Sequence, residues 1–170
     1  MESCFMRDGR EVANYILDYA DDNGISVTNL GLQKITYFCH AWFLVSANKP
    51  LIKQNFEAWE FGPVLPYLYR FFKEFGDQKI TTRATKLDPN TGNKVIARIN
   101  MDKSEEALLE SIVSFYSRLG VNQLVDQSHV SGGPWHEVWH HEAKVNPGMQ
   151  ISNQAILNFY TSKERLYTLQ

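Results

Sequence analysis

The sequence predicts an α+β fold that is mostly α: a compact single domain over residues 1–170 with about five to seven helices and a small β element. Three observations lead to this fold class. Apolar residues recur at helical spacing along most of the chain, and residues typical of caps, with Gly and Pro, delimit these stretches. Strand character is confined to a hairpin at 79–100 and a short strand near 56–61.

Two helices are predicted in the first fifty residues. The first spans 11–24 and ends at Gly24, because glycine commonly follows a helix C-terminus. The second follows Thr28, a residue type suited to the N-cap, and ends before Pro50. Its predicted buried face is formed by Leu32, Ile35, Cys39, Trp42 and Phe43.

The stretch "EAWEFGPVLPYLYRFFKEFG", residues 57–76, holds seven aromatic rings, two Pro and two Gly. "GPVLP" is predicted to turn the chain, and Pro66 suits the first position of a following helix. One side of that helix is predicted to be core. Its members are Leu68, Phe71, Phe72 and Phe75. Tyr67, Arg70 and Glu74 are expected on the opposite side, at spacings of three and four.

The second half of the chain continues with a hairpin and further helices. The 79–100 hairpin has its turn at "DPNTGN" and carries one acid, Asp88, against five cations. These are Lys79, Arg83, Lys86, Lys94 and Arg98. A strong helix over 102–120 opens with Asp102 and Glu105 at capping-box spacing and is expected to end at Gly120. Shorter helices are predicted at 122–130, from Pro134, and after Ser152.

Composition indicates a globular protein of the cytoplasm. The chain is 44% hydrophobic and 21% charged, with net charge −2 and pI near 6.2, which argues against wholesale nucleic-acid binding. The N-terminus has no apolar signal core, and the longest apolar run, 35–47, is too short to span a membrane. Cys4 and Cys39 require no disulfide and suit a reducing compartment.

"HEVWH" fits a zinc-binding pattern, with His136 and His140 as ligands and Glu137 as general base. A third ligand is required, and Ala143 and Asn146 stand where the metzincin continuation needs Gly and His. Glu164 is a conceivable distant ligand. Gly and Pro residues confine the motif to a short helix, so we expect no metal and no cofactor. A zinc hydrolase remains an alternative. Otherwise Trp135 and Trp139 bury a helix face and the histidines lie near the surface.

We expect no catalytic residue elsewhere in the chain. Cys39 is predicted to be buried and therefore unreactive, and His40 to be a packed or partly exposed histidine. The sequence contains no phosphate-binding loop and no nucleophile elbow. The cationic hairpin leaves a second alternative, a nucleic-acid-binding regulator, although charges on a strand edge usually serve to prevent aggregation.

Several pieces of the chain coincide with one family pattern. "LQKITYFCHAWFLVSANKPL", then "EAWEFGPVLPYLYRFFKEFG" and a later "GPW" resemble the Panacea domain family, phage-associated GepA-like proteins that include SocA-type antitoxins. The matching positions are Leu32, Gln33, Lys34, Tyr37, Lys49, Pro50, Leu51, Glu57, Ala58, Trp59, Gly62, Pro63, Val64, Pro66, Tyr69, Pro134 and Trp135. The hairpin and the "HEVWH" histidines lie outside the pattern.

The resemblance implies a non-enzymatic antitoxin that neutralises a cognate toxin by direct protein–protein contact. A SocA-type member acts as an adaptor that hands its toxin to a cytosolic protease. Homo-oligomerisation is open, and nucleic-acid or membrane partners are not expected. The residues expected to bind the partner are Glu57, Trp59, Tyr67, Arg70 and Glu74. Tyr, Trp and Arg are the residue types favoured at binding hot spots.

Overall fold

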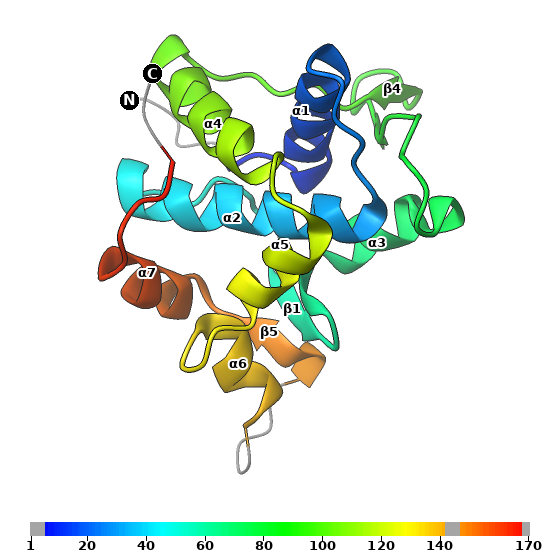
Figure 1. Ribbon diagram of the computed structural model, residues 1–170. Coiled ribbons are helices and arrows are strands. Elements are labelled where there is room, and N and C mark those ends of the chain that lie inside the picture. Colours follow the sequence, from blue (N-terminus) through cyan, green and yellow to red (C-terminus); the bar gives the residue numbers. More distant parts are fainter. Residues whose placement is uncertain (1–5, 142–146, 168–170) are drawn as a thin grey trace.

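The protein is organised around one central helix, α2 (Asn29–Ala47), as seen in a computed structural model that describes residues 6–141 and 147–167 (Figure 1). Fifteen of the 19 residues of α2 are buried. A helix that is apolar on all sides must be covered on all sides. Helices α1, α3, α4, α5 and α7 and strand β2 all contact it. The predicted mostly helical α+β class is confirmed.

The elements follow one another along the described chain as α1 (Gly9–Asp22), α2, β1 (Phe56–Trp59), β2 (Gly62–Val64), α3 (Pro66–Phe71), the 3-10 turn η1 (Lys73–Phe75), β3 (Thr85–Leu87), β4 (Lys94–Ile96), α4 (Lys103–Tyr116), α5 (Val121–Ser128), α6 (Pro134–Trp139), η2 (Pro147–Met149), β5 (Gln150–Ile151) and α7 (Asn153–Thr161). Among the described residues, no helix is long and apolar enough to cross a membrane.

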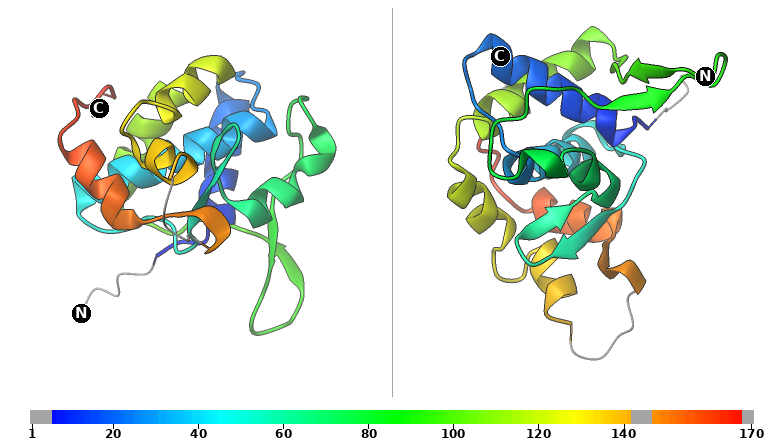
Figure 2. Two further views of the ribbon diagram at one scale, coloured as in Figure 1. Left: turned by 90° about the horizontal axis from the view of Figure 1, so that it is seen from below. Right: turned by 90° about the vertical axis from the view of Figure 1, so that its right-hand side faces the viewer.

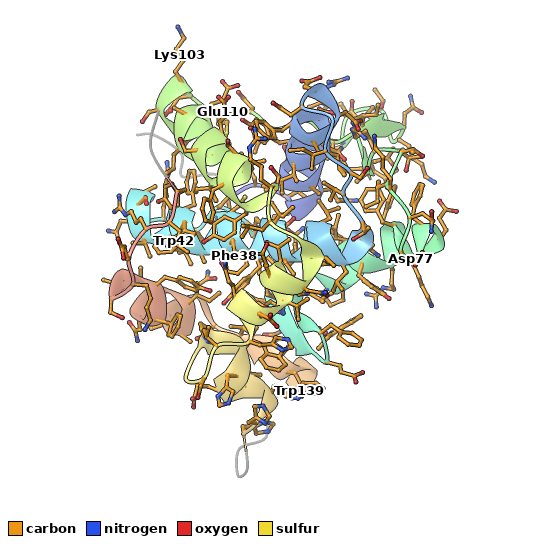
Figure 3. All side chains as sticks on the ribbon, viewed as in Figure 1. Phe38, Trp42, Asp77, Lys103, Glu110 and Trp139 are labelled. Atoms are coloured by element: carbon orange, nitrogen blue, oxygen red, sulfur yellow. The ribbon has the colours of Figure 1, made fainter. Side chains whose placement is uncertain are left out.

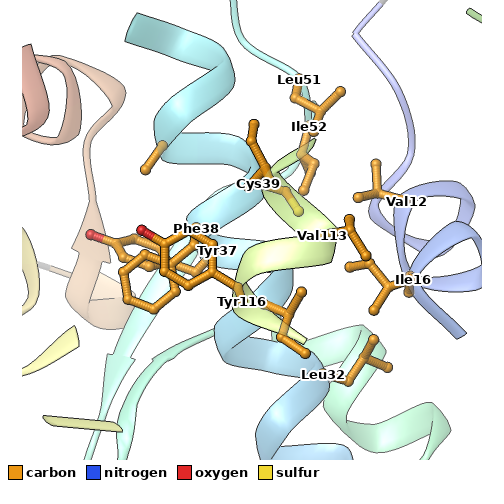
Figure 4. Packing of buried hydrophobic residues seen from close by; sticks show 14 of the residues in the cluster. Val12, Ile16, Leu32, Tyr37, Phe38, Cys39, Leu51, Ile52, Val113 and Tyr116 are labelled. Carbon is orange, nitrogen blue, oxygen red and sulfur yellow. The ribbon is translucent and has the colours of Figure 1, made fainter. Parts of the chain in front are cut away.

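Aromatic and aliphatic side chains of α1, α2 and α4 form the core (Figure 4). Phe38 of α2 stacks on Tyr116 of α4, with ring centroids 4.4 Å apart. The indole nitrogen of Trp42 donates a hydrogen bond to the Tyr116 hydroxyl, 2.6 Å away. Val12 and Ile16 of α1 complete the packing and are fully buried. Truncating such side chains costs about 2–5 kcal/mol, a large share of a domain's stability.

Helix starts follow the predicted caps more closely than helix ends follow the predicted glycines. Thr28 caps α2, and Asp102 and Glu105 form the predicted capping box of α4. The expectation that α4 ends at Gly120 is wrong. The helix ends at Tyr116, and Gly120 instead occupies the N-cap position of α5.

A small antiparallel sheet, ordered β2–β1–β5, lies beside α6. Ala58 of β1 pairs with Pro63, and Phe56 pairs with Ile151 of β5. The sequence indicated only a turn at 62–66, whereas Gly62–Val64 is a strand. Proline fits there because β2 is an edge strand, where an N–H is not needed.

The predicted core side of the third helix is partly wrong. Leu68 and Phe72 are buried and Phe75 is half-buried, but Phe71 is 38% exposed. The α-helix ends at Phe71, and the chain continues into η1. Leu68 is the one buried residue of α3, so this short helix presents a narrower face to the core than the predicted stripe, and Phe71 lies outside that face.

The predicted hairpin is present, with its turn in 88–93, and projects from the helices (Figure 2). Its strands are shorter than the 79–100 prediction. Lys79 and Arg83 precede β3 and therefore lie outside the ladder of the hairpin. The preceding segment is instead tied to the body, where the Ile80 amide donates to the Val27 carbonyl at 2.9 Å.

Candidate functional site

Two adjacent side chains of α2 bind the backbone at the corner of the chain, which is the bend where β2 leads into α3. The Lys34 ammonium donates to the Pro63 carbonyl oxygen at 2.9 Å. The Gln33 amide oxygen accepts from the Leu65 backbone N–H at 3.0 Å. Both side chains are fully buried. These contacts give the Leu-Gln-Lys run of the family pattern a physical role, because they fix the corner's backbone with polar groups that reach it from the core.

A second polar link extends this anchoring to α3. The Gln33 side-chain nitrogen donates to the Asn29 side-chain oxygen at 3.1 Å. Asn29 in turn donates to the Tyr69 carbonyl oxygen at 3.0 Å. The chain of hydrogen bonds therefore runs from the β2–α3 junction through α2 to the second turn of α3, and satisfies backbone groups that would be costly to bury unpaired.

Gly62 is required for the close approach of the corner to α2. Its φ of +111° lies in a region that glycine alone adopts without strain. A Cβ at this position would lie 2.5 Å from Cε of Lys34 and 2.7 Å from the Ser128 hydroxyl. Burial lowers the pKa of Lys34 to about 7, because removing the ammonium from water disfavours its charged form.

Trp59 is the centre of the aromatic groups outside the core. Its ring meets Tyr69 of α3 edge-on, with centroids 5.1 Å apart. Its indole N–H donates to Glu57 at 2.9 Å. The structure therefore brings together Glu57, Trp59 and Tyr69, which the sequence had placed in one corner.

Helix α6 adds further rings to this group. Trp135 donates from its indole nitrogen to the Trp59 carbonyl oxygen at 2.8 Å and stacks on His129 with centroids 3.7 Å apart. Trp139 lies 5.8 Å from Trp135, nearly parallel to it. The expectation that both tryptophans bury a helix face holds for Trp135, which is 4% exposed, and is wrong for Trp139, which is 38% exposed and lies at the lower end of the molecule (Figure 3).

We call this group the aromatic corner, and define it as Trp59, Phe61, Tyr69, Trp135 and Trp139. Phe61, in the turn between β1 and β2, is 59% exposed. Isolated exposed apolar residues are ordinary, but Trp139 is stacked on Trp135 and Phe61 is held in the turn between two paired strands, and exposed aromatic residues in such fixed positions are typical of a binding surface. Sequence reasoning missed Phe61 and Trp139 as surface residues, because neither periodicity nor composition separates a ring at a turn from a ring in the core.

The other residues expected to bind the partner are dispersed. Arg70 and Glu74 are exposed on α3 and η1. Tyr67 faces α1, where the Arg10 guanidinium lies 5.8 Å from its ring and its hydroxyl lies against Gly9. Tyr67 is therefore part of the contact between α1 and α3, and its ring is half-buried.

The "HEVWH" histidines lie close together without a third ligand in the described part of the chain. The His136 and His140 rings are 4.5 Å apart, and Glu137 lies 3.7 Å from Nδ1 of His136. Nδ1 of His136 also accepts from the Gly132 amide at 3.3 Å. Within residues 6–141 and 147–167, no group of three or more His, Cys, Asp or Glu side chains is placed to hold a metal. Positions 143 and 146 lie outside this range.

The other candidates for catalysis are buried structural groups. Burial raises the pKa of the Cys39 thiol, which is fully enclosed. Nδ1 of His40 accepts from the Ile52 amide at 3.2 Å, and Nε2 lies 2.8 Å from the Asn153 side-chain oxygen. Burial lowers the pKa of His40 to about 4, so it is neutral at pH 7. The predicted burial of Cys39 is confirmed, and of the two arrangements that the sequence left open for His40 the structure shows the packed one. Cys4 lies outside the described residues.

Three of the five hairpin cations are paired with acids of α1. Lys79 contacts Asp21 at 3.2 Å, and Arg83 contacts Asp18 at 2.7 Å. The Lys86 ammonium lies 3.7 Å from Glu11. The basic patch suggested by the sequence is therefore largely neutralised by an acidic helix face, which weakens it as a footprint for a phosphate backbone.

Comparison with known proteins agrees with the residues that build the corner. The model of the family described as "Antitoxin SocA-like, Panacea domain" matches residues 32–136, which include Gln33, Lys34 and nearly all of the aromatic corner. The chain belongs to this family. It is also 43% identical over 128 residues to the protein named Antitoxin SocA from Caulobacter vibrioides (strain NA1000 / CB15N), covering 75% of this chain and 68% of that protein. No solved structure matches. The SocA-like match ends at His136, so Trp139 and His140 lie beyond it.

Proposed function

We propose that this protein is the antitoxin of a toxin–antitoxin pair and neutralises a cognate toxin protein by direct binding. The similarity to Antitoxin SocA supports the class of function. The observation that carries the mode of action is the aromatic corner, with its exposed rings Phe61 and Trp139. Phe61 directly precedes β2, whose backbone Lys34 binds at Pro63, and Trp139 stacks on Trp135 of α6.

The physical argument rests on preorganisation. Association costs the conformational freedom of the side chains and loops that it orders. Phe61 lies in the turn between two paired strands, and Trp139 stacks on Trp135, so little of either ring's surroundings remains to be ordered on binding. Glu57 supplies a charged group beside Trp59. A central set of apolar rings with a polar rim is the usual composition of a protein–protein interface.

We place this action in the cytoplasm, with the toxin as a protein partner. In the adaptor form of the proposal, the aromatic corner holds the toxin while a different surface contacts a cytosolic protease. The two forms differ in one observable. A blocking antitoxin leaves the toxin level in the cell unchanged, whereas an adaptor lowers it in a protease-dependent manner.

The test is co-expression with the toxin reading frame beside the gene, scored by growth. The wild-type chain is expected to restore growth, and the double variant Phe61→Ala/Trp139→Ala to fail while remaining folded. Leu166→Ala, which truncates an apolar residue 49% exposed after α7, is the matched control and is expected to rescue. Failure of the wild-type chain to rescue, or full rescue by the double variant, would contradict the proposal.

A further inference from the structure

The hairpin formed by β3 and β4 has one covered edge and one open edge. On the β3 side, Arg10 of α1 donates to the Thr85 carbonyl oxygen at 3.1 Å. Asn14 donates from its side-chain nitrogen to the Ala84 and Ala97 carbonyl oxygens at 2.9 and 2.8 Å. Helix α1 therefore covers β3 and the base of the hairpin, and leaves β4 as the outer strand.

The ladder shows which backbone groups of β4 face outward. Asp88 donates to Asn93, and Ala97 donates to Ala84. In an antiparallel pair, hydrogen-bonded and non-hydrogen-bonded residue pairs alternate, so Lys86 and Val95 form the hydrogen-bonded pair between them. The N–H and C=O groups of Lys94 and Ile96 consequently point away from β3, along an edge that no other described strand covers.

The side chains of the same strand form an exposed apolar and cationic face. Ile96 is 47% exposed, and Leu87, on the neighbouring strand and the same face, is 64% exposed. Val95, which points to the other face with Lys86, is 37% exposed. A two-stranded hairpin is only marginally stable alone, and exposed apolar side chains on an open edge favour the addition of another strand.

The cations of this strand determine which side chains an additional strand should carry. Alternation places Lys94, Ile96 and Arg98 on one side of the strand, in the order cation, apolar, cation. Lys79, Arg83 and Lys86 are paired with acids of α1, whereas within the described chain no ion pair involves Lys94 or Arg98. A strand laid antiparallel along β4 would satisfy this face with acids at positions i and i+4 around an apolar residue at i+2.

We propose that the outer edge of β4 binds an extended segment of a partner protein with the pattern acid-x-apolar-x-acid, which adds to the hairpin as a third strand. Main-chain hydrogen bonds to Lys94 and Ile96 supply the affinity, and the alternating side chains supply the specificity. This surface is distinct from the aromatic corner: β4 and α6 lie at opposite ends of the molecule (Figure 1). The two surfaces can therefore be occupied at the same time.

The test is a titration of the full-length, ¹⁵N-labelled chain with three blocked nine-residue peptides. In the first peptide, Glu and Val take turns at every second position, as the pattern acid-x-apolar-x-acid requires. The second peptide carries Lys in place of each Glu. The third carries Pro at its central position. Amide signals of Lys94 and Ile96 are expected to shift with the first peptide, and their hydrogen exchange to slow. The Lys peptide and the Pro peptide are expected to leave both signals unchanged.

Two variants separate the backbone edge from its side chains. Ile96→Pro removes an outward N–H while leaving the internal ladder intact, and is expected to weaken binding of the acidic peptide by at least about tenfold. Ile96→Thr retains the N–H and is expected to weaken it less. A double change of Lys94 and Arg98 to Glu is expected to abolish binding, whereas Lys103→Glu, a single charge reversal on α4, is expected to have no effect.

Three results would overturn the proposal. The first is an acidic peptide that leaves the Lys94 and Ile96 amides unchanged at millimolar concentration. The second is equal binding of the acidic and basic peptides. The third is a dimer of the free chain in light scattering that Ile96→Pro dissociates, because the edge would then be occupied by a second copy.

Discussion

The ammonium nitrogen of Lys34 lies 2.9 Å from the carbonyl oxygen of Pro63, and the lysine side chain is fully buried. This contact joins the central helix to β2, directly after the turn that carries the exposed ring of Phe61. A buried lysine gains less from one hydrogen bond than it loses in hydration when charged. The protonation state of Lys34 is therefore coupled to the stability of the corner.

Stability should rise with pH because of Lys34. Its pKa is about 7 in the folded chain and has its ordinary value of 10.5 in the unfolded chain, so the unfolded state binds more protons between these values. The free energy of unfolding should increase by on the order of 2 kcal/mol from pH 7 to pH 9. Urea unfolding at both pH values measures this. Lys34→Met should remove most of the increase, and an equal increase in both proteins would contradict the assignment.

Protonation of His40 should lower the free energy of unfolding at acidic pH. Its pKa is about 4 in the folded chain against 6.5 when unfolded, so the unfolded state takes up a proton first as the pH falls. The associated stability is present above pH 6.5 and is lost as the pH falls toward 4. His40→Gln, which does not titrate, should unfold with a flatter dependence on pH between 6.5 and 4.5. Parallel curves for the two proteins would refute the role of His40.

Gly62→Ala should destabilise the protein more than Gly92→Ala, although both glycines have a positive φ. A Cβ at Gly62 meets Lys34 and Ser128, whereas one at Gly92, with φ +71°, meets nothing within 4 Å. Gly92→Ala should cost about 1 kcal/mol from backbone strain, and Gly62→Ala about 2–4 kcal/mol because the clash adds to the strain. Chemical denaturation gives both values. If both variants lost the same free energy of unfolding, the Lys34 side chain would be able to move away from the new Cβ at no energetic cost.

Two neighbouring phenylalanines should behave differently. Phe72 is fully buried, and Phe72→Ala should cost about 3–5 kcal/mol. Phe71 is 38% exposed, so Phe71→Ala should cost under about 1 kcal/mol. Thermal melting of the two variants distinguishes them. If Phe71→Ala alone severely lowered the melting temperature, Phe71 would belong to the core side of the helix, as the sequence suggested.

Much of the fold was predictable because local signals act over a few residues. Capping chemistry at Thr28 and Asp102 placed two helix starts, and "DPNTGN" placed the hairpin turn. The errors arose where tertiary contacts decide. Phe71 was misassigned because α3 presents a narrower face to the core than the apolar stripe in the sequence, and β2 was missed because its pairing with β1 cannot be read from a segment with the composition of a turn.

The candidate site was predictable only in part. Trp59 contacts Glu57 and Tyr69, which are near it in sequence, but the role of the five residues expected to bind the partner stays a prediction. The hydrogen bond between Trp135 of α6 and Trp59 of β1 joins residues that are 76 positions apart, so no local sequence pattern could predict this contact. The neutralisation of Arg83 by Asp18 is likewise a contact between distant segments, which composition alone presented as a free basic patch.

The central claim is that the aromatic corner holds the toxin, and the most direct measurement is the affinity of the purified chain for the toxin encoded beside its gene. Calorimetric titration of Phe61→Ala/Trp139→Ala should show binding weakened by at least about 2 kcal/mol, with the melting temperature close to that of the wild type. Leu166→Ala should bind as the wild type does. A folded double variant that binds the toxin with wild-type affinity would contradict the account.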